Sequence, residues 1–104
     1  MLVLPIKKKW FDMIVSGEKK EEYREIKPYY DSRFYKIIHK DGKIIIGTPR
    51  VIVLRNGYQY DSPSIKCEIE ITQGYGKQEW GAIPNKRYFV LKILKILEVR
   101  NYGV

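Results

Sequence analysis

The chain has 104 residues, 44% of them hydrophobic, which is the size and composition of one globular domain with one core. No apolar run reaches the ~20 residues that a membrane-spanning helix needs, and the N-terminus lacks the basic segment of a signal peptide. We therefore expect a cytoplasmic protein without a membrane partner. Lysine and arginine number 20 against 12 acidic residues, a net charge of +8. This balance suits anionic partners such as nucleic acid or nucleotides, and suits equally well a basic protein without one.

Cysteine and histidine are too scarce for a disulfide or a metal cluster. The chain has one of each, Cys67 and His39, so we expect no metal and no cofactor. Cys67 alternates with isoleucines over residues 65–72, the pattern of a half-buried strand, and we predict a small core residue rather than a nucleophile. His39 falls near the expected end of a helix, where a capping role is favoured.

The first forty residues alternate between strand and helix patterns. Trp10, Met13 and Ile14 follow the i, i+3, i+4 spacing of a helix, and Gly17 stands where helices commonly end on a residue with positive φ. Pro28 suits the first turn of a second helix. We expect strands over residues 2–6 and 19–25 and helices over residues 7–16 and 29–39.

From residue 44 onward the pattern becomes that of strands. Asn56-Gly57 predicts a tight turn leading into residues 58–60. Residues 74–81 form a loop rich in glycine and aromatic residues. The last segment alternates and then loses its alternation, which predicts a strand with a bulge near residues 94–95, or alternatively a helix over residues 90–100. We expect strands over residues 44–46, 51–54, 65–72 and 88–99.

Residues 17–24 bring opposite charges together at one helix–turn–strand corner. On a strand, Glu22 and Arg24 share a face because their spacing is even, and Lys19 joins them only if it stays in the turn after Gly17. Arg24 would then bind a phosphate or carboxylate or pair with Glu22, and Lys19 would bind an anion. Glu22 would accept a base amino group or transfer a proton. The alternative is a solvated, charged edge of little energetic weight.

The same corner carries a family resemblance. The pattern Gly-x-Lys-x-x-Glu-x-Arg, read here at Gly17, Lys19, Glu22 and Arg24, resembles the signature of the ASCH domain, a member of the PUA-like superfamily of small β-barrels. The resemblance covers residues 2–33. It implies that residues 1–104 form one α+β domain, a small PUA-like β-barrel of five to six strands, mixed or antiparallel, with two flanking helices.

The resemblance also implies function. It implies RNA or a modified nucleoside bound in a basic cleft between the first helix and the barrel, beside residues 17–24. Some members of the family resemble amidohydrolases acting on N4-acylated cytidine, in which case Lys19 and Glu22 would be catalytic. In that pattern a threonine stands at the position of Glu22, and the distant catalytic glutamate has only a loose counterpart in Glu79. A third possibility is an interaction or regulatory protein without a small ligand, and no obligate protein partner is evident.

Two further groups are candidates for ligand contact. Lys7, Lys8 and Lys9 begin the first helix, where cations oppose the helix dipole, so anion binding and simple solvation both remain open. Tyr75 and Trp80 lie in the glycine-rich loop, where a base could stack on them. Trp80 could alternatively cover the core of the barrel.

Overall fold

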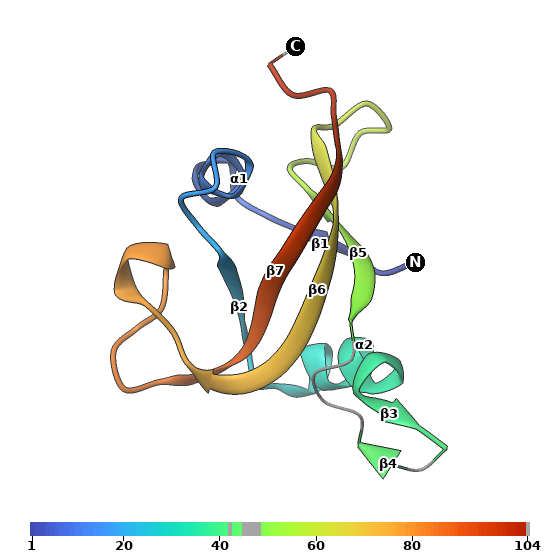
Figure 1. Cartoon of the computed structure of the whole chain (residues 1–104), viewed down its shortest axis with the longest axis vertical. Coiled ribbons are helices and arrows are strands. Elements are labelled where there is room, and N and C mark those ends of the chain that lie inside the picture. The colour runs from blue at the N-terminus through green and yellow to red at the C-terminus, as the bar shows by residue number, and fades with distance from the viewer. Residues whose placement is uncertain (42, 45–48, 104) are drawn as a thin grey trace.

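The computed structural model describes residues 1–41, 43–44 and 49–103, and Figure 1 shows how its elements are arranged. The α-helices are α1 (Lys8–Val15) and α2 (Pro28–Ile38), and a 3₁₀ turn, η1, covers Gln78–Trp80. The strands are β1 (Val3–Pro5), β2 (Glu21–Glu25), β3 (His39–Lys40), β4 (Lys43–Ile44), β5 (Arg50–Arg55), β6 (Ser64–Tyr75) and β7 (Arg87–Arg100).

One mixed sheet forms the body of the domain. Its five strands follow the order β1-β5-β6-β7-β2, with β1 parallel to β5 and all other neighbours antiparallel. The sheet curls into a half-barrel whose edges are β1 and β2, and α1 lies beside the open side between them (Figure 1). A separate two-stranded sheet pairs β3 with β4. The expected α+β class, the two helices and the barrel-like sheet are confirmed.

Both helices bury one apolar face against the concave side of the sheet. Phe11 and Ile14 of α1 are buried, as the helical spacing of the apolar residues predicts. Helix α2 begins at Pro28, whose missing N–H costs nothing in a first turn. Its buried residue, Phe34, meets Phe89 of β7 edge to face with ring centroids 5.0 Å apart. The expected helix bounds hold to within one residue at each end.

The last segment of the chain is a strand with two bulges. Register shifts leave one extra residue on β7 at Leu94 and another at Leu97. Ile93 precedes the first bulge, Ile96 lies between the two and Val99 follows the second, and all three pack against the core. Each bulge places two outward-facing residues, instead of one, between successive inward-facing residues. The inward positions therefore recur every third residue, and the alternation disappears. The strand with a bulge is confirmed, and the helix over residues 90–100 is wrong.

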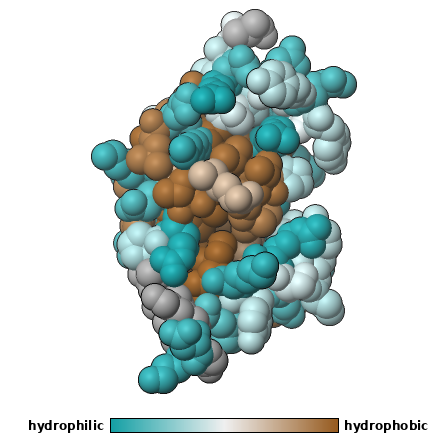
Figure 2. Space-filling view, turned by 90° about the vertical axis from the view of Figure 1, so that its right-hand side faces the viewer, coloured by the Kyte–Doolittle hydropathy of each residue, from teal (hydrophilic) through white to brown (hydrophobic). Residues whose placement is uncertain are grey.

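The core fills the concave side of the sheet and leaves the convex side in solvent. Cys67 is fully buried there beside Ile65 and Ile69, and burial raises the pKa of its thiol to about 12. The predicted core role is confirmed, because a thiol held protonated is a poor nucleophile. Turning β5 toward the viewer shows a contiguous hydrophobic area edged by hydrophilic residues on the outside of the molecule (Figure 2).

Two local expectations differ from the structure or fall outside it. Residues 58–60 form no strand but belong to the loop between β5 and β6, although Gly57 does take a positive φ of 122°. Residues 45 and 46 of the expected strand lie outside the described residues. The loop between β5 and β6 is long because β6 begins only at Ser64. The backbone N–H of Asn56 donates a hydrogen bond to Pro63 O and closes the loop just before that strand. Among the residues described, neither helix has the length and apolar character needed to cross a membrane.

Candidate ligand-binding pocket

The helix–turn–strand corner places three charged side chains inside the domain. Gly17 takes a φ of 83° just after α1, and the backbone N–H of Lys19 then donates to Met13 O at 2.9 Å. Strand β2 begins at Glu21, so Lys19 stays in the turn. Glu22 and Arg24 occupy the inward positions of β2, and all three side chains are buried. The predicted juxtaposition is confirmed, and the alternative of a solvated charged edge is wrong for these three residues.

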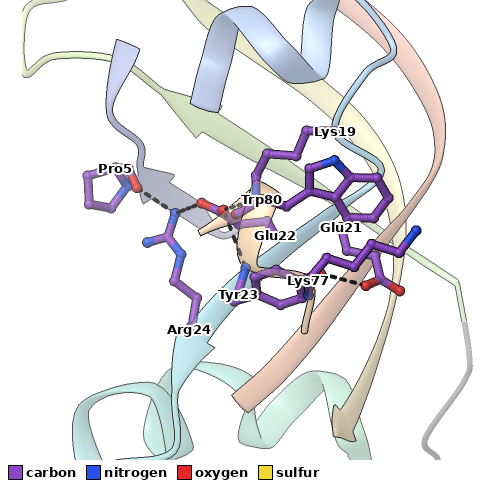
Figure 3. Close-up of polar contacts among 8 residues, drawn as sticks. All are labelled: Pro5, Lys19, Glu21, Glu22, Tyr23, Arg24, Lys77 and Trp80. Atoms are coloured by element: carbon purple, nitrogen blue, oxygen red, sulfur yellow. Dashed lines mark hydrogen bonds and ion pairs between the residues drawn. The ribbon is translucent and has the colours of Figure 1, made fainter. Parts of the chain in front are cut away.

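Glu22 lies at the centre of a buried ion network (Figure 3). One carboxylate oxygen lies 3.3 Å from Lys19 Nζ, and the other accepts a hydrogen bond of 2.7 Å from Arg24. A carboxylate buried beside two cations is compensated in charge, whereas an isolated one would carry a large desolvation penalty. The surplus of one positive charge makes the network attractive to an anion.

Arg24 connects the two edges of the half-barrel. The nitrogen that contacts Glu22 also donates to Pro5 O of β1 at 2.6 Å, and the other terminal nitrogen donates to the Tyr30 hydroxyl of α2 at 3.2 Å. The rigid guanidinium fork reaches these partners simultaneously because its donors point in different directions. Strands β1 and β2 are not paired by a backbone ladder. Side-chain hydrogen bonds from Arg24 therefore join them.

Lys19 is enclosed by aromatic rings and by the η1 turn. Its Nζ donates to Trp80 O and lies 4.9 Å from the ring centres of both Trp10 and Tyr23. Burial disfavours the charged amine and lowers the pKa of Lys19 from its ordinary 10.5, an effect that the neighbouring Glu22 carboxylate opposes. Lys19 thus fixes η1, and with it the Trp80 side chain, against α1 and β2.

Tyr23 anchors the start of the same loop from the other face of β2. Its hydroxyl donates to Glu21 at 2.7 Å and accepts from the backbone N–H of Lys77 at 2.9 Å. Burial raises the pKa of Tyr23. Gly76 packs on this ring so closely that an added Cβ would lie 2.5 Å from it. The loop after β6 is therefore held to β2 at two points, through Tyr23 and through Lys19.

A pocket of about 560 Å³ opens above this network. The volume falls within the ~300–1,000 Å³ of typical small-molecule sites. The wall combines the carboxylate and the guanidinium with large aromatic side chains from four separate segments. It is lined by Pro5, Ile6, Lys7, Trp10, Glu22, Tyr23, Arg24, Asn56, Gly57, Tyr58, Trp80 and Gly81.

The structure divides the residues predicted from the sequence into two groups. Lys7, Glu22, Arg24 and Trp80 line the pocket, and Lys19 lies directly behind its wall, in contact with Glu22. Lys8, Lys9 and Tyr75 do not line it. Lys8 pairs with Asp12 at 2.7 Å, Lys9 lies over the Trp10 ring at 4.6 Å, and the exposed Tyr75 lies under Arg87 at the end of β6.

The far wall of the pocket is not predicted by the sequence patterns. Helical spacing places Trp10 in the core, and the Asn-Gly pair predicts only a tight turn at Asn56 and a strand through Tyr58. Asn56 donates from its side chain to Ile6 O at 2.9 Å, which ties the β5–β6 loop to the segment after β1. The Asn-Gly pair is the available signal, because such turns place side chains at the end of a sheet, where ligands commonly bind.

Gly81 fits the pocket because of both its conformation and its contacts. It takes a φ of 104°, and an added Cβ would lie 2.9 Å from the Trp10 ring. A side chain there would be strained and would displace Trp10.

Within the described part of the chain, no group of three or more His, Cys, Asp or Glu residues could hold a metal. No family model, curated protein or solved structure matches the chain, so the family resemblance continues as a proposal.

The lowered pKa of Lys19 predicts how stability responds to alkaline pH. As the pH rises toward 10.5, the folded protein releases this proton before the unfolded chain does, so the unfolded state binds more protons and stability due to this group increases. The free energy of unfolding of the wild type, relative to Lys19→Met, should therefore rise with pH in urea titrations. The raised pKa of Tyr23 acts in the opposite direction above its ordinary value, but it is present in both proteins and cancels. A constant or falling difference would contradict the assignment.

Proposed function

We propose that this protein is an RNA-binding module that takes one nucleobase, ordinary or modified, into the pocket beside residues 17–24. The observation that carries the proposal is the pocket wall itself. It surrounds a compensated carboxylate, Glu22, with the aromatic side chains of Trp10, Tyr58 and Trp80. A flat heterocycle with amino groups at its edge matches both parts of this wall.

The two parts of the wall recognise different features of a base. Aromatic side chains stack on the face of any base, which contributes about 1–3 kcal/mol per base. Glu22 can only accept hydrogen bonds, and its two cationic neighbours do not exhaust the lone pairs of a carboxylate. It therefore favours a base that presents an amino group, as cytosine, adenine and guanine do, over uracil.

The charge of the protein supports a polyanionic ligand rather than a free neutral nucleoside. The chain carries a net charge of +8, and Lys7 lines the pocket mouth at the start of α1. Lys9 and Lys77 lie over the rings of Trp10 and Trp80, at 4.6 and 4.4 Å, so cations border both aromatic walls. A base inserted between these walls would bring its own phosphates within reach of those cations.

The family resemblance agrees with this proposal. The ASCH signature at Gly17, Lys19, Glu22 and Arg24 resembles that of PUA-like domains, which implies RNA or a modified nucleoside in the cleft next to the first helix. The described fold is compatible with a small PUA-like barrel in its two helices and its curled sheet. Binding of RNA in the cytoplasm is the setting that we propose.

Hydrolysis of an N4-acylated cytidine is a second candidate, favoured by the lowered pKa of Lys19. The geometry favours binding over hydrolysis, because Lys19 does not line the pocket and donates instead to Glu22 and Trp80 O. Incubation with N4-acetylcytidine tests this candidate directly. Release of acetate that is lost in Lys19→Met would favour the hydrolase.

The proposed function is tested with short single-stranded RNA oligonucleotides at several salt concentrations. We expect binding whose affinity falls steeply as salt rises, because each neutralised phosphate releases a counterion. Oligomers containing cytosine, adenine or guanine should bind more tightly than oligouridine. If no oligomer binds at low salt, or if the affinity does not respond to salt, the proposal is wrong.

A pair of aromatic substitutions tests the pocket itself. Trp80→Ala should weaken RNA binding by about 1–3 kcal/mol, because a base loses one stacking face. Tyr75→Ala is the matched control, since Tyr75 comes from the same loop region, is exposed and lies outside the pocket. It should change the affinity little. Equal losses in the two variants, measured by fluorescence anisotropy, would place the RNA on the loop surface instead of in the pocket.

A further inference from the structure

The convex face of the sheet carries partly exposed apolar side chains. Val51 and Val53 alternate with the fully buried Ile52 and Leu54, so they point outward from β5. Val3 of β1 lies beside Val53 and is 39% exposed. This side of the molecule shows the hydrophobic area in Figure 2. Exposed apolar areas of this kind commonly mark interaction sites.

The bulges of β7 enlarge the same face. Leu94 and Leu97 are the extra residues of the two bulges and are 37% and 43% exposed. A bulge places two successive residues opposite one residue of the neighbouring strand. Each bulge therefore adds one side chain away from the core, and in both cases that side chain is a leucine. Solvent exposure alone does not account for leucine at both positions.

Four of the charged residues of this face form two inverted rows across the strands, beside a further row that holds Arg55 and Arg100. In one row, Val53 of β5 lies beside Lys66 of β6, which lies beside Glu98 of β7. In the adjacent row of outward-facing residues, Val51 lies beside Glu68, which lies beside Lys95. The order is apolar, positive, negative in the first row and apolar, negative, positive in the second. The two rows together therefore carry no net charge, although the whole chain carries +8.

We propose that two copies of this chain pack convex face to convex face, related by a two-fold axis that crosses the strands between the two rows. This rotation exchanges the rows. It sets Val51 against Val53 of the other copy, Lys66 against Glu68, and Lys95 against Glu98. A closed two-fold interface requires a self-complementary surface of this type.

A second copy fits this face better than a nucleic acid does. Phosphates need an excess of positive charge, whereas lysines and glutamates alternate in the two rows. Face-to-face packing of two sheets is a common arrangement in which apolar side chains interdigitate. A specific interface of this kind would bury ~800 Å² per partner.

The arrangement leaves the proposed RNA pocket free. The pocket opens between β1, β2 and α1, on the side where the sheet is not closed. The dimer would therefore carry two pockets facing away from the shared interface. The inference stands independently of the RNA proposal, since neither the rows nor the leucines line the pocket.

Charge reversal provides the test, with the mass in solution measured by sedimentation equilibrium over a concentration series. The wild type should approach twice the monomer mass. Lys66→Glu and Glu68→Lys should each weaken self-association about tenfold or more, because like charges then face each other across the axis. An equimolar mixture of these two variants should associate again, since each row then meets its opposite. Lys36→Glu, a reversal on the exposed side of α2, is the matched control and should behave as the wild type.

Three results would overturn the proposal. They are a wild type that remains monomeric at every concentration, single reversals that associate as the wild type does, and a mixture that stays monomeric while both variants are folded by circular dichroism. A double substitution of Leu94 and Leu97 by serine gives an independent measurement and should also weaken association. If the reversals instead change RNA affinity in a monomeric protein, the face serves nucleic acid and the dimer is wrong.

Discussion

Replacing Arg24 by alanine should lower the free energy of unfolding by about 3–5 kcal/mol. Arg24 is buried and holds Glu22, Pro5 O and the Tyr30 hydroxyl at once. Its removal leaves the Glu22 carboxylate with Lys19 as its remaining cation, and leaves the carbonyl of Pro5 without this donor. The connection between the unpaired edges β1 and β2 is lost at the same time. Urea denaturation monitored by tryptophan fluorescence measures the effect.

Arg33→Ala is the matched control for this prediction. Arg33 lies on the exposed side of α2, with its guanidinium 3.5 Å from the centre of the Tyr29 ring. Loss of an exposed cation–π contact costs about 0.5–1 kcal/mol. If Arg24→Ala destabilised the protein no more than Arg33→Ala does, Arg24 would not hold the half-barrel together. It would then act only through a ligand.

The charged corner of the site could be predicted because it depends on local rules. Gly17 ends a helix, and the even spacing of Glu22 and Arg24 places them on one face of a strand wherever that strand lies. The sequence did not show that this face is the buried one. Burial of Lys19 depends on Trp10 of the preceding helix and on the Trp80 carbonyl, which lies 61 residues further along the chain. Such contacts arise from sheet order and curl rather than from spacing.

Tyr75 and Trp80 illustrate the same limit. Both come from one glycine-rich segment, and the sequence made both of them candidates for stacking on a base. Strand β6 extends as far as Tyr75 and directs it to solvent, whereas the turn η1 returns Trp80 to the pocket, where Lys19 holds its carbonyl. The length of β6 is set by its pairing with β7, which reaches Tyr75 opposite Arg87. Pairing between strands decided which aromatic residue reaches the site.

Strand β7 contains one bulge that the sequence pattern predicted and a second that it did not. Loss of alternation after Ile93 correctly indicated a bulge near residues 94–95, but the second bulge at Leu97 was not anticipated. Inward residues every third position resemble a helical stripe over a short stretch, which is why a helix was an alternative. Lys92, Lys95 and Glu98 are readily interpreted as solvated residues. The pairing register between β6 and β7 shows that each of them lies beside a residue of opposite charge on β6.

Glu22→Gln should be the most informative single change in the pocket. The substitution keeps the shape of the side chain but leaves Lys19 and Arg24 as two buried cations without a countercharge, which should lower stability by about 3–5 kcal/mol. The amide also offers hydrogen-bond donors where the carboxylate only accepted, so the preference for bases with amino groups should weaken. The exposed Glu25→Gln, whose pair with Lys86 spans 3.9 Å at the surface, is the control and should cost no more than about 1 kcal/mol.

An added anion separates the electrostatic role of Glu22 from mere packing. With the carboxylate gone, Arg24 in the pocket wall and Lys19 behind it form an anion site, so phosphate should raise the melting temperature of Glu22→Gln more than that of the wild type. Thermal melts of both proteins and of Glu25→Gln, taken in phosphate and in a buffer of equal ionic strength, measure this difference. Equal responses to phosphate, or a Glu22→Gln variant as stable as Glu25→Gln, would show that Glu22 does not compensate these cations. The carboxylate would then not be the acceptor on which recognition of a base edge depends.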